Sequence, residues 1–291
     1  MFSGSIVAII TPFDKHGNVN YEKLKELIDF HVENGTSAVL VLGTTGENPT
    51  LTPEERQEII ETAVQHAGGR IKIIAGTGTN STLKSIEYTK FAEKTGADGA
   101  LVITPYYNKP TQDGLYEHFK TVAGKCNIPI IIYNVPGRTG CNILPETVKR
   151  LSEIDNIVAI KEASGNVVQI SEIHRLCGDK ITILSGDDPL TLPILAVGGK
   201  GVISVTANIV PDRVAAMVKA WNNKDVDKAL ALHNDLLPLH QAMFIETNPL
   251  PVKTSLNLMG KDVGDFRLPL VSMKPKNVET LKQILKQHRV I

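Results

Sequence analysis

Residues 129–164, PIIIYNVPGRTGCNILPETVKRLSEIDNIVAIKEAS, contain the unit that decides the fold. The apolar, β-branched runs at its two ends, 129–136 and 157–164, each predict a buried strand, and the stretch from Leu144 to Ile154 has helical periodicity. A strand, a helix and a second strand in this order predict a parallel pair with a right-handed crossover.

The same alternation continues in both directions along the 291 residues. Eight strands with nearly continuous Val and Ile content are typical of a sheet buried on both faces, so a doubly wound sheet also fits. Eight units within about 205 residues favour a (βα)8 TIM barrel. The other predicted strands are 5–13, 38–43, 72–78, 99–107, 181–188 and 201–206.

Helix signals support these boundaries. Thr52 precedes Pro53 and is followed three residues later by Glu55, which predicts a capped helix start. The sequence after residue 206 contains helical patterns and no strand candidate. We therefore expect a barrel domain over 1–224 and a C-terminal three-helix extension over 225–291 that packs on the barrel.

The bulk composition excludes several classes of protein. Lys and Arg number 31, as do Asp and Glu, so the zero net charge argues against a nucleic-acid or membrane-surface footprint. Cys126, Cys141 and Cys177 are odd in number and lack CxxC spacing, which favours reduced thiols. The first residues lack a signal-peptide pattern, and no apolar run is long enough to span a bilayer. These features predict a cytoplasmic protein.

Lys161 is unusual because it lies inside a predicted buried strand. In a barrel the site lies at the carboxyl ends of the strands. Burial lowers the pKa of a lysine, and the neutral amine can form an imine with a carbonyl. The alternative is a structural ion pair of Lys161 with Glu162 or Glu47. This residue alone leaves both interpretations open.

Three hydroxyls stand at other predicted strand ends: Thr44, Tyr107 and Tyr133. A chain of hydroxyls can relay the protons that imine formation and breakdown require. Buried Tyr and Thr more often satisfy one hydrogen bond each. Their occurrence at three strand ends favours the relay.

Two segments could bind carboxylates. The turn GTTGE (43–47) offers backbone N–H groups and two hydroxyls, although it could be an ordinary turn before a helix. Arg138 in the GRTG turn could hold a second carboxylate with its fork of donors, although a loop arginine is usually a surface residue.

Other signals fail. The segment GTGTNST (76–82) lacks the third glycine of a dinucleotide fingerprint. His233 and His240 share a helix face without a third ligand, so no metal site is expected. The pair Asp187 and Asp188 could indicate a Mg²⁺ site, but a carboxylate pair in a turn more often caps the following helix, and we expect that role here.

The motifs GTTGE, ITPYYNKP, YNVPGRTG, IKEASG and SGDD, in this order, resemble the 4-hydroxy-tetrahydrodipicolinate (dihydrodipicolinate) synthase family. The resemblance covers essentially the whole chain and lies within the pyruvate-dependent class I aldolases, which include N-acetylneuraminate lyase. Arg138 favours the synthase, because the sister lyases generally carry other residues there.

The resemblance implies a role for each site residue. Lys161 would form a Schiff base with pyruvate, and the enamine would attack L-aspartate 4-semialdehyde. Tyr133, Thr44 and Tyr107 would relay protons. Thr45 would bind the pyruvate carboxylate and Arg138 the semialdehyde carboxylate. The pocket near the lysine would be lined by Gly186 and the carbonyl of Ile203.

The resemblance also implies an assembly and a pathway. The family is usually a homotetramer built from two dimers, in which Tyr107 comes from the neighbouring subunit. It uses neither a metal nor an organic cofactor, and it catalyses the first committed step of lysine and diaminopimelate biosynthesis.

One departure from the family concerns inhibition by lysine. Tyr106 and Asn80 match the inhibitor pocket of sensitive members. Lys84 stands where those members have a glutamate, Arg56 where they have a histidine, and Pro49 where they have a small residue. Two extra cations would repel a cationic ligand, which predicts weak or absent inhibition.

Two other functions remain alternatives at this point. A sister aldolase could cleave a keto-sugar acid, which Arg138 argues against. A non-catalytic barrel could sense a keto acid, but a binding protein would not need the relay.

Overall fold

The computed structural model describes residues 2–291. Eight strands follow the chain order and form a closed barrel, with parallel neighbours in the ladders β1–β2 and β3 to β8. This confirms the predicted TIM-barrel class and excludes the doubly wound sheet. The strands are β1 (Gly4–Ala8), β2 (Ala38–Val41), β3 (Lys72–Gly76), β4 (Gly99–Ile103), β5 (Ile130–Asn134), β6 (Ile157–Glu162), β7 (Thr182–Ser185) and β8 (Gly201–Ser204).

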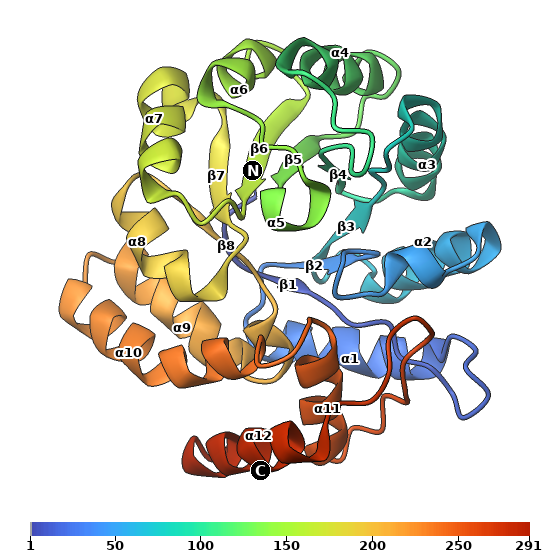
Figure 1. Cartoon of the computed structure of the whole chain (residues 1–291), viewed down its shortest axis with the longest axis vertical. Coiled ribbons are helices and arrows are strands. Elements are labelled where there is room, and N and C mark those ends of the chain that lie inside the picture. Colours follow the sequence, from blue (N-terminus) through green and yellow to red (C-terminus); the bar gives the residue numbers. More distant parts are fainter. Residues whose placement is uncertain (1) are drawn as a thin grey trace. The chain divides into compact units, whose positions relative to one another are not determined.

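Helices alternate with the strands and then continue to the end of the chain (Figure 1). Their starts follow the capping signals: Thr52 and Glu55 form the reciprocal hydrogen bonds of a capping box at α2. The helices are α1 (Tyr21–Glu33), α2 (Pro53–Ala67), α3 (Thr82–Thr95), α4 (Gln112–Ala123), α5 (Pro136–Thr139), α6 (Pro145–Leu151), α7 (Val167–Cys177), α8 (Thr191–Ala196), α9 (Pro211–Asn222), α10 (Val226–Ala242), α11 (Leu250–Leu258) and α12 (Pro275–Gln287).

Two compact units divide the chain. The first contains the residues up to Gly4 together with Lys72–Ile203. In it α3, α4, α6 and α7 lie outside strands β3 to β7 (Figure 1). The hydrophobic core between these strands and helices includes Ile132 of β5, Ile160 of β6 and Phe119 of α4. Burial of such side chains stabilises the fold by about 25 cal/mol per Å² of apolar area.

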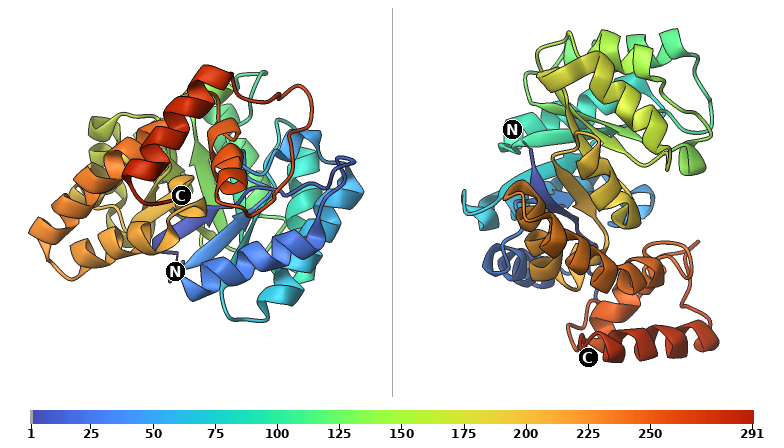
Figure 2. Two further views of the ribbon diagram at one scale, coloured as in Figure 1. Left: turned by 90° about the horizontal axis from the view of Figure 1, so that it is seen from below. Right: turned by 90° about the vertical axis from the view of Figure 1, so that its left-hand side faces the viewer.

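The second unit contains Ser5–Ile71 and Ser204–Ile291. Within it α9 packs on α10, and α12 packs beside α11 and α10 (Figure 2). The helices α10, α11 and α12 are the three that the sequence predicts after residue 225. The domain boundary placed at residue 224 stays a prediction.

The predicted strands were too long at their carboxyl ends. The run 99–107 ends as a strand at Ile103, and the run 5–13 ends at Ala8. The backbone cannot stay extended at Tyr107, where φ is +73°. The apolar runs in the sequence thus extend past the ends of the strands into the loops. Hydrophobicity alone does not show at which residue the hydrogen bonding between strands ends.

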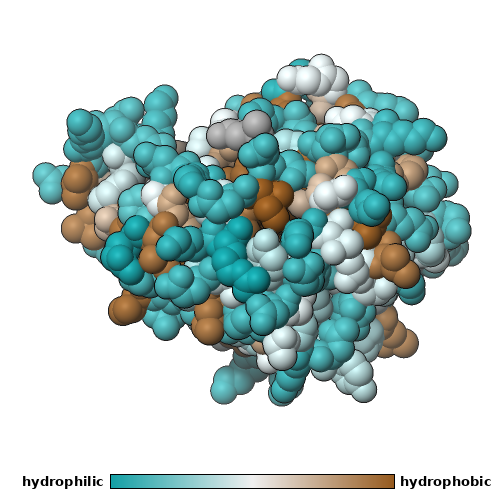
Figure 3. Space-filling model, turned by 90° about the horizontal axis from the view of Figure 1, so that it is seen from above, coloured by the Kyte–Doolittle hydropathy of each residue, from teal (hydrophilic) through white to brown (hydrophobic). Residues whose placement is uncertain are grey.

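Figure 3 shows one face of the surface, which is mainly hydrophilic, with apolar side chains scattered singly or in small groups. Within residues 2–291 no helix is both long and apolar enough to cross a bilayer.

Candidate active site

Lys161 and Tyr133 lie side by side on neighbouring strands. Tyr133 of β5 is the register partner of Lys161 of β6, and both side chains are buried. The amine Nζ lies 4.2 Å from the centre of the Tyr133 ring. This geometry brings two of the predicted site residues together, with the amine close to the aromatic ring.

The surroundings of Lys161 increase the fraction of its amine that is neutral. Burial lowers the pKa of the amine from 10.5 to about 8, the negative charge of Asp188 raises it, and the positive charge of Arg138 lowers it further. With a pKa of about 8, roughly a tenth of the amine is neutral at pH 7. Lys161 is therefore both shielded from water and available as a nucleophile.

The ion-pair alternative for Lys161 is excluded by the partners of the two glutamates. The Glu162 carboxylate accepts hydrogen bonds from Asn134 at 2.6 Å and Ser164 at 2.8 Å. Glu47 forms its ion pair with Lys253 at 2.8 Å. Among the described residues Lys161 itself forms no salt bridge.

Gly186 follows β7 and makes room for the Lys161 side chain. A Cβ at position 186 would lie 3.0 Å from Cγ and 3.1 Å from Cε of Lys161. The Gly186 N–H also donates to the carbonyl of Glu162 at 2.7 Å. The same Cβ would lie 2.9 Å from the Cβ of Ala163, so a larger residue would crowd both Ala163 and the Lys161 side chain. Ile203, the other predicted pocket residue, is buried in β8.

The two aspartates after Gly186 do not cap a helix, so that expectation was wrong. Neither the short 3₁₀ turn at Asp188 nor α8 has a side-chain cap. The Ser185 hydroxyl instead holds the turn, accepting from the Asp187 N–H at 3.2 Å and donating to the Asp187 carbonyl at 2.7 Å. The Asp188 carboxylate acts on Lys161 and raises its pKa, while burial raises the pKa of Asp187.

Arg138 lies on α5, a single helical turn that follows β5 directly. The sequence analysis did not predict this helix, because its Pro136 and Gly137 are typical of a loop. Gly140 ends the turn with a φ of +73°, and Arg138 is exposed. The positive charge of Arg138 lowers the pKa of Lys161.

Thr44 and Thr45 lie in the second unit, in a tight turn after β2. The Glu47 N–H donates to the Thr44 carbonyl, and the Gly46 N–H donates to the Gly43 carbonyl, both at 3.1 Å. Thr44 is half-buried, whereas Thr45 is buried. The turn therefore has a fixed backbone.

The sequence analysis missed two residues that hold this turn. The Asn248 amide donates to the Thr45 hydroxyl at 3.0 Å. The Lys253 amine is fully buried, binds Glu47 and donates to the carbonyl of Asp265 at 2.6 Å. A lysine inside the apolar stretch LPVKTSLNL is the same kind of signal that identified Lys161, and it was available in the sequence.

Tyr107 is placed differently from the other predicted relay residues. Its side chain is 89% exposed, and its backbone is in the left-handed region. Its N–H approaches the Thr139 carbonyl at 3.4 Å. A large aromatic ring that its own chain leaves in solvent is available to a second molecule.

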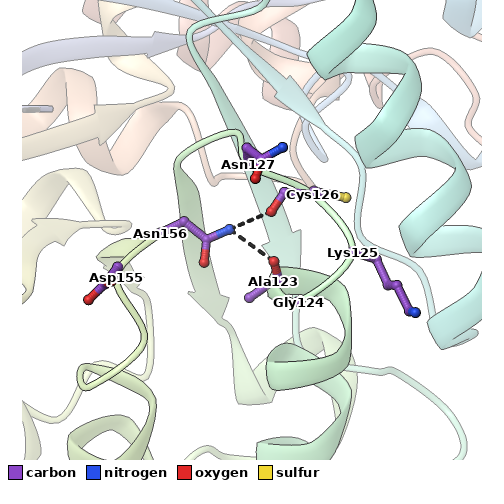
Figure 4. Close-up of a pocket in the computed structure, with 7 residues that line it drawn as sticks. All are labelled: Ala123, Gly124, Lys125, Cys126, Asn127, Asp155 and Asn156. Carbon is purple, nitrogen blue, oxygen red and sulfur yellow. Dashed lines mark hydrogen bonds between the residues drawn. The ribbon is translucent and has the colours of Figure 1, made fainter.

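A pocket of about 520 Å³ lies in the first unit, in the loops that precede β5 and β6 (Figure 4). Asn156 spans it, and its amide donates to the carbonyls of Ala123 at 3.1 Å and Cys126 at 2.8 Å. This is the amino-terminal end of the strands, whereas barrel sites lie at the carboxyl end. The pocket is therefore separate from Lys161.

Potential metal ligands are dispersed. Nowhere in the described part of the chain do three or more His, Cys, Asp or Glu side chains gather as a metal site would require. The three cysteines are free thiols.

A buried lysine beside a tyrosine at the carboxyl end of a barrel strand fits a lyase of the class I aldolase type, the class predicted from the sequence. The model of the Dihydrodipicolinate synthetase family matches residues 1–288, and the chain belongs to this family. A 4-hydroxy-tetrahydrodipicolinate synthase of Citrifermentans bemidjiense is 55% identical, with both chains covered completely. This match assigns to the chain the activity that gives that relative its name.

Solved structures agree with this assignment. Dihydrodipicolinate synthase from Aquifex aeolicus has a TM-score of 0.97 and 53% identity, with 99% of each chain covered. The enzyme from Acinetobacter baumannii, solved with pyruvate bound, has a TM-score of 0.98 and 44% identity over the whole of both chains. The family, enzyme class and activity predicted from the sequence are confirmed.

Proposed function

We propose that the chain condenses pyruvate with L-aspartate 4-semialdehyde through a Schiff base on Lys161, as the first committed step of lysine and diaminopimelate biosynthesis in the cytoplasm. The observation that carries this proposal is the buried Lys161 amine, which has no carboxylate partner among the described residues and a pKa near 8. The amine adds to the pyruvate carbonyl, water leaves, and an imine forms. Loss of a proton from the methyl group gives an enamine, whose carbon attacks the aldehyde.

Tyr133 is proposed as the first member of the proton relay. Its ring lies beside the Lys161 amine. Its phenol can give a proton to the hydroxyl group that leaves as water, and the resulting phenolate can take up a proton that the reacting groups lose. Thr44 continues the relay, and the exposed Tyr107 completes it from a neighbouring subunit. This arrangement requires at least a dimer, and the family's usual homotetramer supplies it. No metal or organic cofactor takes part.

The two residues proposed to bind substrate carboxylates, Thr45 and Arg138, differ in burial. Thr45 binds the pyruvate carboxylate from a turn that Asn248 and Glu47 hold in place. Arg138 is exposed and receives the semialdehyde carboxylate, with which its planar fork can form two hydrogen bonds. Gly186 and the carbonyl of Ile203 line the pocket around the bound keto acid.

The direct test is a coupled assay. Pyruvate and L-aspartate 4-semialdehyde are supplied, the next reductase consumes the product, and loss of NADPH absorbance is followed. Turnover supports the proposal. No turnover, with pyruvate still trapped by borohydride, would point to a sister aldolase and to sugar acids as the aldehyde. Failure of both would favour a keto-acid sensor.

The proposed assembly has its own test. Sedimentation of the wild type should reveal a tetramer or dimer. Mixtures of Tyr107→Phe with Lys161→Ala should regain activity, because a mixed dimer with one subunit of each variant contains one complete site. A monomer with full activity would contradict the shared site.

A further inference from the structure

The carboxylate of Glu162 lies on the opposite side of β6 from Lys161. Successive side chains of a strand point to opposite faces, so Glu162 shares its face with Ile160 and enters the helix layer. Its register partner on β5 is Asn134, the residue next to Tyr133. Glu162 and Asn134 are both fully buried. A carboxylate in this apolar layer needs a structural or chemical reason.

Neutral donors surround this carboxylate. The Asn134 amide donates to Oε1 at 2.6 Å and the Ser164 hydroxyl donates to Oε2 at 2.8 Å. Gln169 of α7 also lowers the pKa of this carboxylate. Burial raises the pKa of Glu162, and these hydrogen bonds lower it. The charges that shift the pKa of Lys161 are those of Asp188 and Arg138.

The hydrogen bonds continue to the segment behind Arg138. The same Asn134 amide donates to Oδ1 of Asn142 at 2.7 Å. The Asn142 amide donates to Gln169 at 2.8 Å, and the Asn134 Oδ1 accepts from the Ile143 N–H at 3.2 Å. Glu162, Asn134, Asn142 and Gln169 together form what we call the β5–β6 clamp. It joins both strands, the segment after α5 and helix α7.

We propose that the β5–β6 clamp is a positioning element for the reaction, with Glu162 at its centre, which holds Lys161 against Tyr133 on one side and the Arg138 turn on the other. This inference rests on the proposed function of Lys161. The clamp residues touch no substrate, so they act through the strands that carry the reacting groups. Misplacement of reacting groups by about 1 Å can reduce a rate by roughly 10²-fold.

The test compares Glu162→Ala with Glu162→Gln. Glutamine keeps the length of the side chain, an oxygen that can accept from Asn134, and an amide that can donate to the Ser164 hydroxyl. We expect Glu162→Ala to lower kcat per borohydride-trappable site by about 10²-fold, with a smaller change in KM for pyruvate. Glu162→Gln should restore most of kcat. Glu172→Ala, which removes an exposed carboxylate on α7, is the matched control.

A second readout separates positioning from simple loss of stability. The pH midpoint of pyruvate trapping should shift in Glu162→Ala, because the amine moves relative to Asp188 and Arg138, and should stay at the wild-type value in Glu162→Gln. Asn134→Ala should reproduce the effect, and combining it with Glu162→Ala should add little.

Three outcomes would overturn the inference: unchanged kcat per trappable site in Glu162→Ala, an unshifted midpoint, or a Glu162→Gln variant as impaired as Glu162→Ala. If the wild type itself neither traps pyruvate nor turns over, the proposed function fails instead.

Discussion

Lys161 and Lys253 are the two buried lysines among residues 2–291, and their partners are opposite in kind. Lys253 in the second unit pairs with Glu47, donates to a backbone carbonyl and lies 4.1 Å from the Phe13 ring centre. Lys161 in the first unit has the Tyr133 ring and no ion pair. Burial lowers the pKa of both amines, but Glu47 acts directly against that effect at Lys253.

The difference shows what makes a buried lysine reactive. A carboxylate in contact keeps an amine charged and satisfied, so Lys253 fastens α11 to the turn that holds Thr45. An amine buried without such a partner is easily deprotonated, and a neutral amine attacks carbonyls. Burial alone does not distinguish the two lysines; the presence of a contacting carboxylate does.

The largest expected effect is on turnover in Lys161→Ala. Removing the nucleophile should reduce kcat by at least about 10³-fold, since the covalent intermediate cannot form. Steady-state assay of the coupled reaction measures this. The variant should remain folded, because no ion pair is broken; retention of activity would contradict the assignment.

The next effect is on stability in Lys253→Met. Breaking a buried pair leaves the Glu47 carboxylate without its cation and should cost about 3–5 kcal/mol of unfolding free energy. Urea denaturation checks this value. The double variant Lys253→Met with Glu47→Gln should recover part of the loss. If Lys253→Met were as stable as Lys161→Met, the conclusion that only Lys253 forms a buried ion pair that matters for stability would be wrong.

A smaller effect concerns pH. Lys161 has a pKa of about 8 in the folded chain, against an ordinary lysine value of 10.5. Between these values the unfolded chain binds a proton that the folded chain does not, so stability should rise with pH, by at most about 3 kcal/mol. As the pH is raised from 7 to 9.5, the unfolding free energy of the wild type should increase relative to that of Lys161→Met. The initial rate of pyruvate trapping should rise through pH 8, and a flat profile would refute a neutral nucleophile.

The smallest effect concerns a third lysine, Lys84, which is exposed at the start of α3. Arg56 of α2 donates to the side chain of Asn48. These two cations replace an acid and a histidine of lysine-sensitive members, so free L-lysine should inhibit weakly or not at all. A titration of the coupled assay with L-lysine decides this. Half-inhibition below 1 mM would show that the substitutions do not matter.

Much of the fold was predictable because strand and helix periodicities alternate along the whole chain. The strand ends were not, since apolar residues continue into the loops, as at Tyr107. The helix α5 was missed because Pro136 and Gly137 mark loops, and only the tertiary setting makes them one helical turn.

The candidate site was predictable where a residue type conflicted with its surroundings, as a lysine inside a buried strand does. Lys253 presented the same conflict and was missed because a helix tolerates lysine on one face. The sequence could not show which lysine pairs with which glutamate. Glu47 and Lys253 are 206 residues apart, and no local pattern shows that they meet.

The most direct test of the central claim is to map the site of covalent trapping. The wild type is incubated with pyruvate, reduced with borohydride, digested and analysed by mass spectrometry. We predict one reduced adduct, on the peptide that contains Lys161, and an unmodified Lys253. An adduct on Lys253, or no adduct at all, would contradict the conclusion that a missing carboxylate partner makes a buried lysine the nucleophile.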